Sequence, residues 1–159
     1  MTVTSEPSTD IQIETAEPLE PRRRQALQEM AESMVRVSRH GGCLLRVADP
    51  IPAHVGLGSG TALLMSAAQA MNAALELDLT HAQIVALARR SGTSAVGTAS
   101  QLLGGLCVDV GRPLAASEHI GPSSSAQRGK SSLILGSWPV PDDWTVTILF
   151  PSLGPTVDP

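Results

Sequence analysis

A glycine-rich stretch directly before a long apolar run most constrains what this chain can fold into. Residues 51–65 read IPAHVGLGSGTALLM, and the run over 61–77 contains no glycine or proline. Ala, Leu and Met dominate that run, so it predicts a helix that is apolar on most sides and therefore central. The short apolar segment 43–47 precedes the glycines and predicts a strand, which two prolines end. We therefore expect the order strand, glycine loop, buried helix.

Helical and strand patterns alternate along the rest of the chain. Apolar residues recur at three- and four-residue intervals over 22–36, which predicts an amphipathic helix. A Thr80–Gln83 pair of the capping-box type predicts the start of another helix, over 80–90. Short apolar or alternating segments predict strands at 11–13, 106–110, 132–135 and 144–150. This interleaving predicts an α+β fold, with helices packed on one face of a mixed sheet.

Composition and charge argue against several classes of partner. The 159 residues carry 11 Lys and Arg against 15 Asp and Glu, a formal net charge of -4, so we expect no nucleic-acid partner. The basic cluster at 22–24 is short and is expected to be a solvated helix turn. No run reaches the roughly 18 apolar residues of a membrane span, and the acidic N-terminus has no apolar signal-peptide core. We therefore expect no membrane partner, a cytoplasmic location, and reduced thiols at Cys43 and Cys107.

The glycine loop has the chemistry of an anion site. The first turn of a helix leaves backbone N–H groups without partners, and the helix dipole adds partial positive charge there. Glycines let the backbone approach a phosphate closely, so the candidate contacts are Gly56, Gly58, Ser59, Gly60 and Thr61. The loop is neither a Walker A motif, which needs a lysine, nor a G-x-G-x-x-G fingerprint. The alternative is that the glycines only allow tight packing between helix and strand.

The residues around the loop resemble those of a known superfamily. The segment PAHVGLGSGT, over 52–61, is similar to the phosphate loop P-x-x-x-G-L-G-S-S of the GHMP kinases. Within that superfamily, His54 and the Gly60–Thr61 ending most resemble the β-ribofuranosylaminobenzene 5'-phosphate synthases. Residues 89–112 are similar to that branch's R-S-G-x-G-T segment and the G-G-x-x-V-D-x-G that follows, and 139–151 resemble its next strand.

The resemblance implies a fold and a domain layout. The fold is the N-terminal domain of the GHMP kinases, which is like domain 2 of ribosomal protein S5, and we expect it to be incomplete here. Residues 1–20 are expected to be a flexible segment and 21–151 a partial phosphate-binding domain. Residues 152–159 are expected to be a tail where a second domain would begin, so the chain is interpreted as a truncated member.

The resemblance also implies a reaction. GHMP kinases carry an acidic residue about seven positions before the G-G pair, and the residue here is Gly97, which cannot act as a base. The branch implies instead that phosphoribosyl pyrophosphate condenses with 4-aminobenzoate, losing CO2 and pyrophosphate, in tetrahydromethanopterin biosynthesis. Two alternatives stay open: a small-molecule kinase using ATP, and a non-catalytic fragment that acts through self-association or a partner chain.

Further residues are candidates for this chemistry. His54 and Arg90 are the catalytic candidates, although a structural histidine and a solvated helix end are the alternatives. A second polar loop is expected to contact the ribose phosphate through Ser91, Gly92, Gly97 and Thr98. Asp109 is the candidate ligand for Mg²⁺ or another divalent cation, or it points to solvent. We expect a homodimer, or pairing with a missing C-terminal part.

Overall fold

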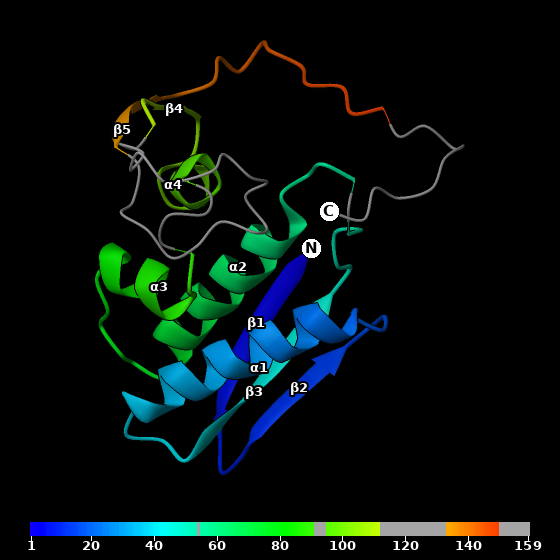
Figure 1. Cartoon of the computed structure of the whole chain (residues 1–159), viewed down its shortest axis with the longest axis vertical. Coiled ribbons are helices and arrows are strands. Elements are labelled where there is room, and N and C mark those ends of the chain that lie inside the picture. The colour runs from blue at the N-terminus through cyan, green and yellow to red at the C-terminus, as the bar shows by residue number, and fades with distance from the viewer. Residues whose placement is uncertain (54, 91–94, 112–132, 150–159) are drawn as a thin grey trace, which may run out of the picture.

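The computed structural model describes residues 1–53, 55–90, 95–111 and 133–149 (Figure 1). Its elements are β1 (Thr2–Ser8), β2 (Ile11–Thr15), α1 (Pro21–Arg36), β3 (Gly42–Ala48), α2 (Ser59–Ala74), α3 (His81–Leu87), α4 (Ala95–Leu103), β4 (Leu106–Asp109) and β5 (Ile134–Trp138). The α+β class is confirmed, as is the predicted order of strand, glycine loop and long helix. Across these ranges, no helix is both long enough and apolar enough to cross a membrane.

The main sheet has three strands in the order β1-β3-β2. β1 is antiparallel to β3, and β2 is parallel to it, so the sheet is mixed as predicted. The expectation that residues 1–20 are flexible is wrong for 2–15, because both segments find a hydrogen-bonding partner in β3. β1 escaped prediction because it is polar and contains Pro7, which an edge strand tolerates.

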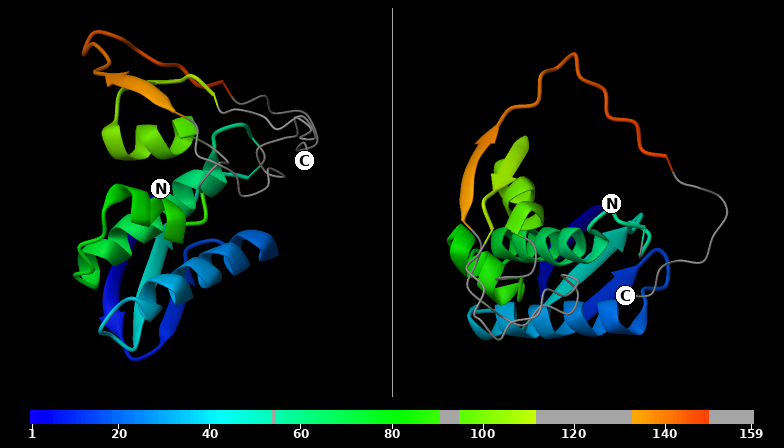
Figure 2. Two further views of the ribbon diagram at one scale, coloured as in Figure 1. Left: turned by 60° about the vertical axis from the view of Figure 1, so that its left-hand side comes forward. Right: turned by 45° about the horizontal axis from the view of Figure 1, so that its top comes forward.

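The link between β1 and β2 explains the Gly41–Gly42 pair. Only Thr9 and Asp10 join the two strands, and β3 starts between them (Figure 2). A Cβ at Gly42 would stand 2.2 Å from the carbonyl carbon of Asp10, and one at Gly41 would stand 2.9 Å from the carbonyl oxygen of Thr9. The backbone of the link therefore crosses the start of β3 at a distance that only glycine permits.

Helices α1 and α2 cover one face of this sheet (Figure 2). The predicted apolar stripe of α1 is fully buried, and so are the inward-facing residues of β3 and most of α2. The largest fully buried side chains are Leu27, Met30, Met34, Cys43, Leu45, Val47, Leu63, Met65 and Met71. On the opposite face, Arg46 makes ion pairs with Glu6 at 2.8 Å and Glu14 at 2.9 Å. The two faces therefore divide into an apolar core and a charged surface.

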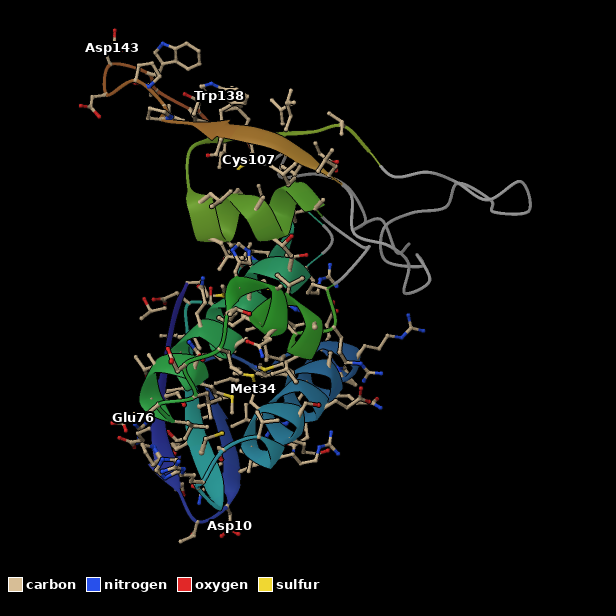
Figure 3. The ribbon with its side chains drawn as sticks, turned by 90° about the vertical axis from the view of Figure 1, so that its left-hand side faces the viewer. Asp10, Met34, Glu76, Cys107, Trp138 and Asp143 are labelled. Carbon is tan, nitrogen blue, oxygen red and sulfur yellow. The ribbon has the colours of Figure 1, made fainter. Side chains whose placement is uncertain are left out.

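A second unit contains α4 and the antiparallel pair β4-β5. It lies at the far end of the molecule from the β1–β2 turn, as the positions of Trp138 and Asp10 show (Figure 3). The predicted strand at 132–135 is instead β5, which begins at Ile134. The predicted strand over 144–150 is wrong for 144–149, which carry no strand and expose Trp144, Val146 and Leu149. Alternating residues favour a strand, but a strand needs a neighbour to bond with.

Candidate anion-binding site

The glycine loop leads into α2 through two left-handed residues. Gly56 has φ of 78° and Gly58 has φ of 62°, a conformation that residues with a side chain rarely adopt. Gly58 is the N-cap of α2 and has no side chain with which to cap the helix. Within the described residues, a Cβ built at Gly56, Gly58 or Gly60 would meet no atom within 4 Å. The glycines therefore do not serve tight packing against any described element, and no described atom fills the space beside the loop.

The first turn of α2 presents donors to this space. The first helical hydrogen bond runs from the N–H of Ala62 to the carbonyl of Gly58, at 3.0 Å. The N–H groups of Ser59, Gly60 and Thr61 therefore have no acceptor within the helix. The first turn contains no acidic residue that would neutralise the positive end of the helix dipole. Uncapped donors and an open approach fit an anionic ligand.

Arg90 is held against this turn. Its Nη2 donates to the hydroxyl of Thr61 at 2.5 Å, and the Thr61 residue is only 4% exposed. Burial lowers the pKa of the Arg90 guanidinium. The backbone of the preceding Arg89 has a positive φ, in the left-handed region. Its side chain makes an ion pair with Glu29 of α1, which holds the end of α3 against α1. Arg90 is thus a partly buried cation that contacts the first turn of α2, rather than a fully solvated side chain at a helix end.

Helix α3 owes its start to the predicted capping box. The Thr80 hydroxyl accepts from the Gln83 N–H, and the Thr80 N–H donates to the Gln83 side chain at 2.8 Å. This confirms the helix start predicted from the sequence. Helix α3 is shorter than the predicted 80–90, because the backbone of Arg89 has a positive φ that a right-handed helix does not allow.

The second polar loop is only partly a loop. Gly97 and Thr98 lie in the first turn of α4, so the prediction of a loop there is wrong. Helix α4 reaches α2 through a hydrogen bond from Ser66 to Gln101, at 3.4 Å. The Thr98 hydroxyl, which is buried, donates to the carbonyl of Ala95 at 3.0 Å. The other candidates of this loop, Ser91 and Gly92, lie outside the described residues, as does His54.

Asp109 ends β4 in a local turn. Its Oδ1 accepts a hydrogen bond from the N–H of Gly111 at 2.7 Å. In the described part of the chain, no group of three or more His, Cys, Asp and Glu side chains is placed to hold a metal ion. The described His, Cys, Asp and Glu side chains therefore form no preformed metal centre. The role of Asp109 as a metal ligand stays a prediction.

One residue at the loop was not predicted. Arg23 of α1 donates from Nη1 to the carbonyl of Ile51 at 3.2 Å, and its Nε and Nη2 atoms are buried without a hydrogen-bond partner. The prediction of a solvated cluster holds for the exposed Arg22 and Arg24 but not for Arg23. Nothing in a run of three arginines distinguishes the middle one, because its burial depends on where the segment 49–53 lies.

Comparison with known proteins identifies the family. Residues 24–107, more than half of the chain, match the model of the GHMP kinases N terminal domain. The chain belongs to the GHMP kinase family. The matched region contains the glycine loop, helix α2 and the core residues of α1 and β3.

Two relatives indicate the branch of the family. The chain is 35% identical to a protein of Archaeoglobus fulgidus over 134 residues, which are 84% of this chain and 42% of that protein. It is 31% identical to a protein of Methanothermobacter thermautotrophicus over 106 residues, 67% of this chain and 32% of that protein. Both are named beta-ribofuranosylphenol 5'-phosphate synthase, which confirms the predicted branch. The chain spans less than half the length of each, and their name has phenol where we expected aminobenzene.

Proposed function

We propose that this chain binds the diphosphate of phosphoribosyl pyrophosphate at residues 56–61. We propose further that it is a ribofuranosyl-aromatic 5'-phosphate synthase or part of one. The open, uncapped first turn of α2, with Arg90 held against Thr61, carries this proposal. The relatives' name supports a phenol product, so 4-hydroxybenzoate joins 4-aminobenzoate as a candidate acceptor. The place of this reaction in tetrahydromethanopterin biosynthesis is part of the same proposal.

The reaction balances without an added acid or base. The bond from ribose C1' to the diphosphate breaks, and both electrons leave with pyrophosphate. The ring carbon that bears the carboxylate bonds to C1', and the bond from that carbon to the carboxylate then breaks. Its electrons return to the ring, and CO2 leaves. The free N–H groups of α2 and the Arg90 guanidinium would stabilise the charge that develops on the leaving diphosphate.

A divalent ion would add to that stabilisation. Mg²⁺ commonly binds through substrate phosphates and only one or two protein carboxylates, so it would enter with the diphosphate. Asp109 is the proposed protein ligand, and His54 and Arg90 keep their proposed catalytic roles. The kinase alternative remains the second candidate because of the family match, and Gly97 at the position of the acidic residue argues against it.

Gly60→Ala gives a direct test of the diphosphate site. The added methyl meets no described atom within 4 Å, and alanine favours a helix over glycine by about 0.5–1 kcal/mol, so the free energy of unfolding should rise. The same methyl would stand where the ligand approaches the first turn, so affinity for pyrophosphate should fall about tenfold. Calorimetric titration with pyrophosphate and urea unfolding measure the two effects. Gln69→Ala, further along α2, is the control and should leave pyrophosphate affinity unchanged.

Turnover then separates the synthase from the kinase. The chain is incubated with phosphoribosyl pyrophosphate, Mg²⁺ and each aromatic acid, and release of pyrophosphate and CO2 is measured. A parallel reaction contains ATP and candidate alcohols. Equal pyrophosphate affinity in the wild type and Gly60→Ala would contradict the site, and alcohol-dependent ATP consumption would favour the kinase.

A further inference from the structure

Arg23 has donors that the fold does not use. It lies in the first turn of α1, and the one hydrogen bond that it makes within the described part of the chain goes from Nη1 to the carbonyl of Ile51. A guanidinium offers five N–H donors in a fixed fork, and here Nε and Nη2 are covered and unpaired. Burying such donors without an acceptor is costly, and the cost is larger for a charged group. Burying the Arg23 guanidinium therefore costs the folded chain free energy, and the hydrogen bond to the Ile51 carbonyl offsets only part of that cost.

The place of Arg23 in the first turn of α1 also destabilises that helix. Cations are unfavourable at the N-terminus of a helix, and the first turn of α1 holds three arginines and no acidic residue. Arg22 and Arg24 reduce this effect by reaching solvent, since both are exposed. The buried guanidinium of Arg23 cannot do so. Neither helix stability nor packing explains an arginine at this position, whereas an anionic ligand would relieve both costs.

Arg23 and Arg90 lie at opposite ends of the same loop. Arg23 contacts Ile51 where the loop begins, and Arg90 contacts Thr61 where α2 begins. The first turns of α1 and α2 both lie at the end of the sheet where β3 finishes (Figures 1 and 2). The N-termini of α1 and α2 therefore both lie near the glycine loop. Arg23 contacts its start, and Arg90 contacts its end. This arrangement suits a ligand with two separate anionic groups.

We infer that Arg23 binds a second anionic group of the ligand, the 5'-phosphate of the ribosyl donor whose diphosphate lies at residues 56–61. The inference rests on the proposed function. The planar fork of a guanidinium matches two phosphate oxygens, which its Nε and Nη2 would bind together. Both atoms are covered here, so binding requires the side chain to rotate or residues 50–53 to shift. Those residues lie outside helices and strands.

Three ligands distinguish this role from the diphosphate site. We titrate the full chain, wild type and Arg23→Gln, with pyrophosphate, ribose 5-phosphate and phosphoribosyl pyrophosphate. Arg23→Gln should weaken phosphoribosyl pyrophosphate and ribose 5-phosphate by about tenfold or more, as loss of a charge-assisted bidentate contact implies. Its affinity for pyrophosphate should stay within about twofold of wild type. Arg24→Gln is the matched control, because it removes the same charge and a bond to a backbone carbonyl, that of Ile13.

Each outcome decides between the two claims. If the wild type binds no pyrophosphate, the proposed function fails and the inference falls with it. If pyrophosphate binds but Arg23→Gln leaves the affinities for ribose 5-phosphate and phosphoribosyl pyrophosphate unchanged, the inference alone is overturned. Arg23→Lys keeps the charge and loses the fork, so it should show an intermediate loss. This variant also tests the inference if Arg23→Gln does not fold by circular dichroism.

Discussion

Gly42 is the residue where one methyl group should matter most. Its Cβ would stand 2.2 Å from backbone of the β1–β2 link, which cannot move without separating strands that β3 holds. Gly42→Ala should therefore lower the free energy of unfolding by about 3 kcal/mol or more, above the usual cost of overpacking. Urea unfolding measures this. Gly60→Ala adds the same methyl in open space, and a similar loss there would contradict the argument.

Cys43 gives stability an alkaline limit. Burial raises the pKa of its thiol above the ordinary value of 9.0, so above that pH the unfolded chain releases a proton that the folded chain retains. The stabilisation is complete below pH 9 and is lost as pH rises through the folded pKa, at about 1.4 kcal/mol per unit. Unfolding measured from pH 7 to 11 should show this decline. Cys43→Ala should be less stable at pH 7 but should show a shallower decline above pH 9.

At the scale of the element, α3 depends on its cap. It has only 7 residues, and isolated helices of this length do not persist, so the Thr80–Gln83 box and packing at Ile84 hold it. Thr80→Ala should cost about 1 kcal/mol of unfolding free energy. Because α3 precedes Arg90, pyrophosphate affinity should also fall. Thr147→Ala, at an exposed position, is the control and should change neither quantity.

The same elements show what the sequence could predict. The periodic apolar residues of α1 and α2 and the capping box of α3 act within a few turns, so their pattern was sufficient. Whether a segment pairs depends on a distant partner: polar β1 pairs because β3 lies beside it, and apolar 144–149 does not pair. Helix α4 was missed because Gly97 and its Ser and Thr neighbours favour loops.

The candidate site divides in the same way. The succession of a glycine loop and a long helix was predicted correctly because the two are adjacent in sequence, whereas the anion-binding role of the loop stays a prediction. The contact of Arg90 with Thr61 joins residues 29 positions apart, and that of Arg23 with Ile51 joins residues 28 apart. Neither spacing has a local signal, so packing of α1 and α3 decides both.

At the scale of the whole molecule, the two sheets differ in their outer faces. The three-stranded sheet presents Arg46 and its glutamates, whereas β4, β5 and the residues beside them expose apolar side chains. These are Leu106, Val108, Val110, Leu133, Leu135 and Trp138, each at least 37% exposed. Exposed apolar surface of this kind marks interaction sites, and among the described strands β4 and β5 pair only with each other, which leaves edges that a second chain could pair with.

We expect the chain to self-associate through this surface. Sedimentation velocity should show a species that grows with concentration, and Leu133→Ser with Leu135→Ser should raise the dissociation constant about tenfold or more. Val37→Ser is the control, because Val37 is 55% exposed but lies at the end of α1. A monomer at all concentrations, or equal effects of both changes, would contradict the expectation.

The position of β3 between β1 and β2 also sets an order in time. Two strands joined by two residues would ordinarily form a hairpin as soon as both exist. Here they do not, because among the described strands each bonds to β3, which begins at residue 42. On the ribosome, residues 2–15 therefore emerge before β3 and wait unpaired while α1 is made. These two strands thus acquire their structure only after a segment that is synthesised later.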